Sequence, residues 1–122
     1  MNLNSVLIGS EDPARLVEYY RRLFGEPEMA GGPYTAWRIG SGGFVVGPHD
    51  QVTGQNQQPG RIIWNIESPD VKGDFERLKA AGATVIREPY DPGMPEGNAA
   101  MAIATFADPD GNYFQLITPM EM

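Results

Sequence analysis

The sequence predicts an α+β fold made of two similar units, and two observations support this. A strand pattern followed by a capped helical pattern occurs twice along the 122 residues, and a turn motif near the C-terminus joins two strands. A chain of this length fits one domain. We divide that domain into unit one at 1–47, a linker at 48–60 and unit two at 61–122.

Unit one begins with a strand at 3–10, in which Val6 and Ile8 share one face. Ser10, Glu11 or Asp12 can cap a helix that starts at Pro13. Gly25 ends this helix. Before it, apolar side chains recur at helical spacing, at Leu16, Tyr19, Tyr20 and Leu23. Short strands follow at 34–39 and 43–47.

Unit two repeats this order with a strand at 61–66, a cap at Ser68 and a helix that Gly82 ends. The apolar stripe of that helix is Val71, Phe75 and Leu78. Matching the caps and helix ends places Ser5 with Arg61 and Asp12 with Ser68. Further strands are expected at 84–87, 101–106 and 113–118. The loop at 88–100 is either a lid or rim, or a plain surface insertion.

The most informative segment is 106–116, where Pro109, Asp110 and Gly111 supply the residues of a tight turn. The strand after it alternates, so that Tyr113 and Gln115 share one face. The opposite face carries Phe114 and Leu116, which we expect to lie beneath a helix.

Composition limits the classes of function. The formal net charge is −7, which argues against binding nucleic acid, and there is no cysteine for a disulfide or a thiolate metal site. No apolar run approaches the ~20 residues that span a bilayer, and the first residues show no signal peptide. We expect a soluble, cytoplasmic protein that does not bind membranes.

The two βαβββ units, the helix pattern at 19–25 and the turn at 108–112 resemble the vicinal oxygen chelate superfamily. This superfamily contains the glyoxalase, bleomycin-resistance and extradiol dioxygenase proteins. The resemblance covers nearly the whole chain and implies an open, mixed-sheet half-barrel whose cleft holds a ligand or a divalent metal. It also implies a homodimer, with the units paired within one chain or exchanged between two.

Metal-using members of this family place His or Glu at four inward positions. Here those positions fall on Ser5, Gly47, Arg61 and Gln115, a poor set of ligands for a divalent cation. A dication beside the guanidinium of Arg61 would be repelled by about 8 kcal/mol, taking about 4 kcal/mol per unit-charge pair at about 4 Å and an effective dielectric of about 20. We therefore expect no metal and no cofactor.

Strand parity assigns the cleft face. The ligand-binding residues that we expect are Ser5, Leu7, Trp37, Arg61, Ile63, Asn65, Tyr113 and Gln115. Arg61 could fork onto a carboxylate, phosphate or carbonyl group, or pair with a surface acid such as Asp70. Gln115 could orient the ligand or satisfy a neighbouring polar group.

Two aromatic residues and the only histidine need separate comment. Trp64 is expected in the core with Ile62 and Ile66, whereas Trp37 suits either core packing or stacking on a planar ligand. Histidine is the residue type suited to proton transfer near neutrality, so His49 is a candidate general base, but its polar loop favours exposure. The predicted cleft strands carry no Asp or Glu.

These observations favour a metal-free protein that binds a small organic molecule, in the manner of the antibiotic-sequestering branch. One alternative is a glyoxalase-like lyase or isomerase, or a dioxygenase, with a metal site that the alignment misplaces. A second is metal-free catalysis, in which Arg61 stabilises an oxyanion and His49 moves a proton. A third is a dimeric scaffold whose cavity has no remaining role.

Overall fold

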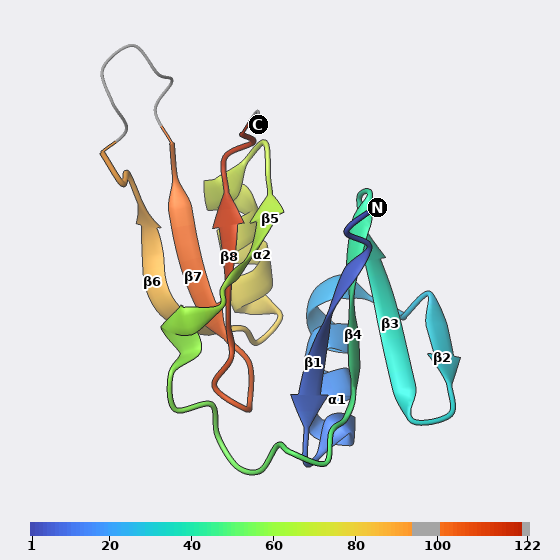
Figure 1. The fold of residues 1–122 in the computed structure, drawn as a ribbon. Helices are drawn as coiled ribbons and strands as arrows, with labels where there is room; N and C mark the ends of the chain where they lie inside the picture. The colour runs from blue at the N-terminus through green and yellow to red at the C-terminus, as the bar shows by residue number, and fades with distance from the viewer. Residues whose placement is uncertain (94–100, 121–122) are drawn as a thin grey trace. The chain divides into compact units, whose positions relative to one another are not determined.

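The computed structural model describes residues 1–93 and 101–120, which form two compact units, Met1–Gln55 and Asn56–Met122. Each unit contains a strand, a helix and three further strands, and in each the helix covers one face of a four-stranded sheet (Figure 1). The prediction of an α+β fold with two βαβββ units and open mixed sheets is confirmed. Within the described residues, neither α-helix is long and apolar enough to cross a membrane.

In the first unit, the sheet order is β1-β4-β3-β2. Strands β1 and β4 are parallel, and the other neighbours are antiparallel. The elements are β1 (Ser5–Ser10), α1 (Pro13–Phe24), β2 (Met29–Gly31), β3 (Tyr34–Ile39) and β4 (Gly42–Pro48). The three-residue strand β2 was not predicted.

The second unit has the same topology, with the sheet order β5-β8-β7-β6 and one parallel pair, β5 with β8. Its elements are a 3-10 helix (Pro59–Arg61), β5 (Trp64–Glu67), α2 (Val71–Ala80), β6 (Thr84–Tyr90), β7 (Ile103–Ala107) and β8 (Tyr113–Ile117). Strand β6 reaches Tyr90, so it includes the start of the predicted loop 88–100. Residues 94–100 of that loop lie outside the described residues.

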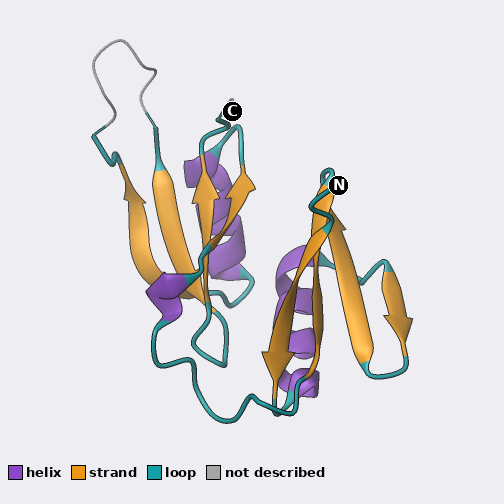
Figure 2. Cartoon of the chain, in the orientation of Figure 1, coloured by secondary structure: helices purple, strands orange, loops and turns teal. Residues whose placement is uncertain are grey.

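The start of the second unit differs from the prediction. Arg61 ends the 3-10 helix, which is drawn as a short helix between two loops (Figure 2), and β5 begins only at Trp64. Pro59 explains this difference, because its fixed φ suits the first turn of a helix. Arg61, Ile63 and Asn65 alternate as residues of a strand do, but only Asn65 lies in β5, so the strand is shorter than predicted.

An aromatic cluster forms the core of the first unit. The ring of Trp37 stacks on Phe44 at 5.1 Å between centroids, and Tyr20 of α1 lies 4.9 Å from Phe44. The indole of Trp37 donates a hydrogen bond to the carbonyl of Gly25 (2.9 Å), which ties the end of α1 to β3. Trp37 is only 4% exposed, so of its two predicted roles the structure favours core packing over ligand stacking.

The core of the second unit is a row of stacked rings beneath α2. Phe75 of α2 lies 5.5 Å from Phe106, which stacks on Phe114, and Trp64 stacks on Phe114 at 5.1 Å. The prediction for Trp64 is thus supported, but Ile62, expected on the same face, is 75% exposed because it precedes β5.

The two helices begin in corresponding ways. The buried hydroxyl of Ser10 accepts a hydrogen bond from the backbone N–H of Asp12 (3.0 Å), and that of Ser68 accepts one from Asp70 (3.1 Å). Ser68 therefore corresponds to Ser10, 58 positions earlier, and not to Asp12 as predicted. The predicted match of Ser5 with Arg61 is wrong by two residues, and Ser5 corresponds to Ile63.

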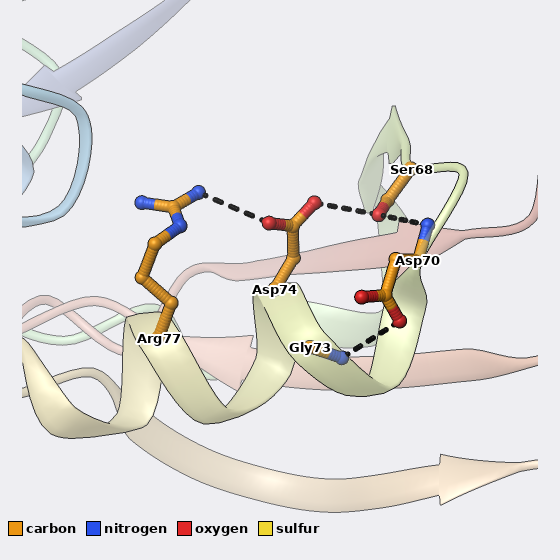
Figure 3. A network of polar contacts seen from close by, with 5 residues as sticks. All are labelled: Ser68, Asp70, Gly73, Asp74 and Arg77. Atoms are coloured by element: carbon orange, nitrogen blue, oxygen red, sulfur yellow. Dashed lines mark hydrogen bonds and ion pairs between the residues drawn. The ribbon is translucent and has the colours of Figure 1, made fainter.

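The second helix has a side-chain cap (Figure 3). The carboxylate of Asp70 accepts a hydrogen bond from the backbone N–H of Gly73 (3.0 Å), and Ser68 donates one to Asp74 (2.6 Å). Asp74 also pairs with Arg77 at 3.4 Å. Asp12 occupies the equivalent position before α1 without a side-chain cap. Asp70 therefore stabilises a helix start and is not the partner of Arg61.

The turn between β7 and β8 is organised by Asp108, which is 4% exposed. One of its carboxylate oxygens accepts hydrogen bonds from the backbone N–H groups of Asp110 (2.9 Å) and Asn112 (3.0 Å). The side-chain amide of Asn112 also donates to this carboxylate. Gly111 has a φ of 82°, which glycine tolerates best. The predicted turn is confirmed, and its first aspartate holds it together.

Candidate functional site

The face of the second sheet opposite α2 carries a polar row, one residue from each strand. Arg87 of β6 pairs with Thr105 of β7, Thr105 with Gln115 of β8, and Gln115 with Asn65 of β5. Paired residues on neighbouring strands project to the same face of a sheet. We call Arg87, Thr105, Gln115 and Asn65 the polar row.

A β-bulge places Arg87 in this row. Val85 pairs with Phe106 and Arg87 with Thr105, so two residues of β6 span one step of β7. In a regular ladder Ile86 would oppose Thr105, and Arg87 would point toward the helix-covered face. The bulge therefore turns a cation toward the face where Gln115 lies.

The members of the polar row differ in how they are held. The amide of Gln115 donates a hydrogen bond to the hydroxyl of Thr105 (3.1 Å), and Thr105 is only 6% exposed. The guanidinium carbon of Arg87 lies 3.4 Å from the ring centroid of Tyr90. Asn65 is exposed. The row thus offers one fixed cation, two amides and a buried hydroxyl.

The rows on either side are mostly apolar. Ala107 and Tyr113 form one neighbouring pair, and Ile103 and Ile117 form the other. Glu67 of β5 pairs with Ile117, so it lies on this face as well. The prediction that these strands carry no carboxylate is therefore wrong for Glu67, which was placed just beyond the strand.

Arg61 does not belong to this row. It is exposed, and its guanidinium donates two hydrogen bonds to the side-chain oxygen of Gln58, at 3.0 and 2.6 Å. Arg87 was missed because the bulge at Ile86 breaks the alternation from which faces are assigned. Thr105 was missed because its neighbours in β7 are all apolar, which hides the parity of the strand.

The corresponding face of the first sheet is apolar and hollowed. A hollow of about 380 Å³ is lined by Met29, Ala30, Gly31, Tyr34, Ala36 and Val45. A smaller one of about 170 Å³ shares Met29, Ala36 and Val45, and it includes Ser5 and the ion pair of Glu28 with Arg38 (2.9 Å). Leu7 pairs with Val45 and is 53% exposed, so the predicted position of Ser5 and Leu7 on this face is supported.

Two glycines of this face serve as packing surfaces. A side chain at Gly47 would overlap the ring of Tyr34, and one at Gly9 would meet His49. His49 is 45% exposed and lies 3.5 Å from Asp50, and its Nδ1 accepts a hydrogen bond from the backbone N–H of Gln51 (3.1 Å). The histidine is therefore held by its own turn.

The residues present do not fit the metal site that the family resemblance implies. Two of the four predicted metal positions, Ser5 and Gly47, are not paired across β1 and β4, because Gly47 pairs with Gly9. A third position, Arg61, lies outside β5. Because Leu7 corresponds to Asn65, the equivalent of Gln115 in the first unit is Val45 and not Gly47 as predicted. In residues 1–93 and 101–120, no three His, Cys, Asp or Glu side chains gather in a group that could hold a metal ion.

The residues predicted for one cleft are thus divided between the two units. Ser5, Leu7 and Trp37 belong to the first unit, and Arg61, Ile63, Asn65, Tyr113 and Gln115 belong to the second. Within the second unit the structure brings Asn65, Gln115 and Tyr113 to one face of the sheet. Ile63 precedes β5 and is half-buried.

The chain resembles proteins of known structure along almost its whole length. A glyoxalase/bleomycin resistance protein/dioxygenase family enzyme from Burkholderia phytofirmans PsJN is 19% identical, with 98% of this chain and 100% of that chain covered and a TM-score of 0.71. TioX from Micromonospora sp. ML1 is 21% identical, with the same coverage and a TM-score of 0.70. A glyoxalase/bleomycin resistance protein from Albidiferax ferrireducens T118 is 22% identical, with 95% and 98% covered and a TM-score of 0.67.

At these identities the likeness shows a shared fold. A comparison with curated proteins finds no match. The model of the glyoxalase-like domain matches residues 5–117, which include every helix and strand described above. The chain therefore belongs to the glyoxalase-like domain family, within the vicinal oxygen chelate superfamily.

Proposed function

We propose that this glyoxalase-like protein binds a small organic molecule on the polar row, and that it does so without a metal ion. The observation that carries this proposal is the composition of the row itself, with one guanidinium, two amides and a hydroxyl between apolar neighbours. A few polar groups among largely apolar neighbours are the lining that small-molecule sites use.

The donor chemistry supports the metal-free part of this proposal. Divalent cations in proteins are held mainly by imidazole, thiolate or carboxylate groups, and the polar row contains none of them; its two amide oxygens alone are a poor set of ligands. A carboxylate on the same face, that of Glu67, accepts a hydrogen bond from the backbone N–H of Met120 (3.4 Å). A guanidinium at one end of the row would also repel a cation.

An enzymatic function has less support. One structural relative is described as a family enzyme, so catalysis is a real alternative for this fold. In this chain, however, the Nδ1 lone pair of His49 already accepts a hydrogen bond, and Arg61 is bonded to Gln58. Among the residues that the structure describes, no hydrogen bond joins either group to a nucleophilic side chain, as nucleophilic catalysis requires.

Two measurements test the proposal. Elemental analysis of protein purified without chelator should find no stoichiometric zinc, nickel, iron or manganese, and any of them at one per chain would refute the metal-free part. A ligand-observed NMR screen of a broad library of small organic molecules should give saturable binding that competes at one site. Binding that the Arg61→Met and Arg87→Met variants lose equally would contradict the placement at the polar row.

We further propose that the protein is a homodimer in the cytoplasm, as the family resemblance implies. Light scattering coupled to size-exclusion chromatography should give twice the mass of the 13.3 kDa chain. A monomer mass at all accessible concentrations would overturn the assembly proposal and leave the ligand proposal standing.

A further inference from the structure

The polar row also contains information about the charge and shape of its ligand. We infer that the ligand presents a carboxylate to Arg87 and lays a flat apolar body over the neighbouring side chains of Tyr90 and Ile103. This inference rests on the proposed function, because it concerns the same face of the second sheet.

The charge of Arg87 is the first step of the argument. Four other arginines pair with a carboxylate, as Arg21 with Glu26, Arg22 with Glu18, Arg38 with Glu28 and Arg77 with Asp74. No such pair involves Arg87 within residues 1–93 and 101–120, where its recorded partner is the ring of Tyr90. A guanidinium that has no carboxylate partner among the described residues can pair with an anionic ligand.

The contact with Tyr90 is the second step. A guanidinium whose carbon lies 3.4 Å from a ring centroid lies against the ring face, and its N–H groups then point outward around the edge of the stack. The stacked side chain has lost much of its rotamer freedom before a ligand arrives, which lowers the entropic cost of binding. Two parallel N–H groups match the two oxygens of a carboxylate.

The position of Glu67 gives the ligand a direction. Arg87 lies in edge strand β6 and Glu67 in the opposite edge strand β5, three strand spacings away, or about 14 Å. The anionic end of the ligand therefore lies over β6 and β7, away from the carboxylate. The side-chain amides of Gln115 and Asn65 continue the row and can bond a polar group farther along the ligand.

The apolar body is assigned from the adjacent row. Ile103 pairs with both Tyr90 and Ile117, so the ring and the two aliphatic side chains follow one another across β6, β7 and β8. Ile117 is only 5% exposed, so a flat aromatic or unsaturated carboxylate could contact the half-buried Tyr90 and Ile103 while its carboxylate reaches Arg87. A phosphate could also form two parallel hydrogen bonds with the guanidinium, so the flat apolar row beside Arg87 is what favours a planar carboxylate over a phosphate.

Three small probes test this inference by ¹H–¹⁵N NMR of the full chain. Benzoate carries the proposed group, benzamide is its neutral equivalent, and inorganic phosphate is an anion without the flat body. We expect benzoate to shift the amide signals of Arg87, Thr105 and Gln115 saturably, with the weak affinity that so small a probe allows. Benzamide and phosphate should bind about tenfold more weakly or not at all.

The matched variants are Arg87→Met and Arg61→Met, since both arginines are exposed and only the first lies in the row. Arg87→Met should weaken benzoate binding about 10- to 100-fold, because a hydrogen bond to a charged group is lost. Arg61→Met should leave it unchanged. An unchanged spectrum away from the substitution establishes that each variant is folded.

Each other result overturns the inference. Equal shifts by benzoate and benzamide, with no loss in Arg87→Met, would mean that a neutral molecule binds the row, and the proposed function would survive. Stronger binding of phosphate than of benzoate would reassign the ligand to the phosphate esters. No shift by benzoate would remove the carboxylate class, and the library screen would then decide the proposed function separately.

Discussion

The side-chain amide nitrogen of Gln115 lies 3.1 Å from the hydroxyl oxygen of Thr105 on the neighbouring strand, and it donates a hydrogen bond to it. This bond satisfies the amide nitrogen within the sheet and leaves the carbonyl oxygen of Gln115 for another partner. Of the two roles that the sequence left open, this bond supports the one within the sheet, and a role in orienting a ligand stays a proposal.

Replacing Thr105 by valine keeps the shape of the side chain and removes the hydroxyl. We expect a loss of about 1 kcal/mol in the free energy of unfolding, because the half-buried amide of Gln115 loses its acceptor. Urea unfolding measures this change. Thr105→Ser is the control, since it keeps the hydroxyl. An equal loss of unfolding free energy in both variants would contradict the role of this hydrogen bond.

The different starts of α1 and α2 give a second prediction. Asp70→Ala should lower the free energy of unfolding by about 1 kcal/mol, because the backbone N–H of Gly73 loses its cap. Asp12→Ala, at the equivalent position of α1, should change it by less than about 0.5 kcal/mol, since Asp12 makes no side-chain cap. Thermal or urea unfolding of the two variants measures both changes. A larger loss of unfolding free energy in Asp12→Ala than in Asp70→Ala would refute the assignment of the cap to Asp70.

The elements of the fold could be predicted because their signals are local. Pro13, the apolar stripe that ends at Gly25, and the turn around Gly111 each fix backbone geometry within a few residues. The residue-by-residue correspondence between the two units could not be predicted from sequence alone, because helix starts with different caps look alike in sequence. Ser10 and Ser68 are matched by a shared hydrogen bond to the backbone, which no spacing reveals.

The candidate site was harder to predict, because it depends on pairing between strands. Gln115, Asn65 and Tyr113 were found from the alternation of their own strands, which the structure keeps. Arg87 was not found, since one extra residue in β6 reverses the face on which it lies. Arg61 was predicted instead as the cation of the site, because an alternating pattern of residues continues through the segment that Pro59 makes helical.

Asp108→Asn tests the turn that gave the clearest sequence signal. Asparagine can keep the oxygen that accepts from the backbone N–H groups of Asp110 and Asn112, but its NH₂ group would then face the side-chain amide of Asn112, which donates to the other oxygen. We expect a loss of about 1–3 kcal/mol, because the remaining bonds go to a neutral acceptor and two N–H groups face one another. Asp50→Asn is the control, because that side chain is 94% exposed, and calorimetry should find its effect near zero. Equal stability of the two variants would show that the turn does not need the carboxylate.

Gly47→Ala tests whether the ring of Tyr34 must lie directly on β4. A methyl group at this position would overlap the ring, whereas one at Gly42 in the same strand would enter open space. We expect Gly47→Ala to cost about 1–3 kcal/mol, as overpacking does, and Gly42→Ala to cost much less. Because Tyr34 also lines the hollow of about 380 Å³, the displaced ring should shift the NMR signals of Met29 and Val45. In a Tyr34→Ala background the cost of Gly47→Ala should largely disappear, since the overlapping ring is gone. A cost that persists in that background would place the strain in the backbone of β4 instead.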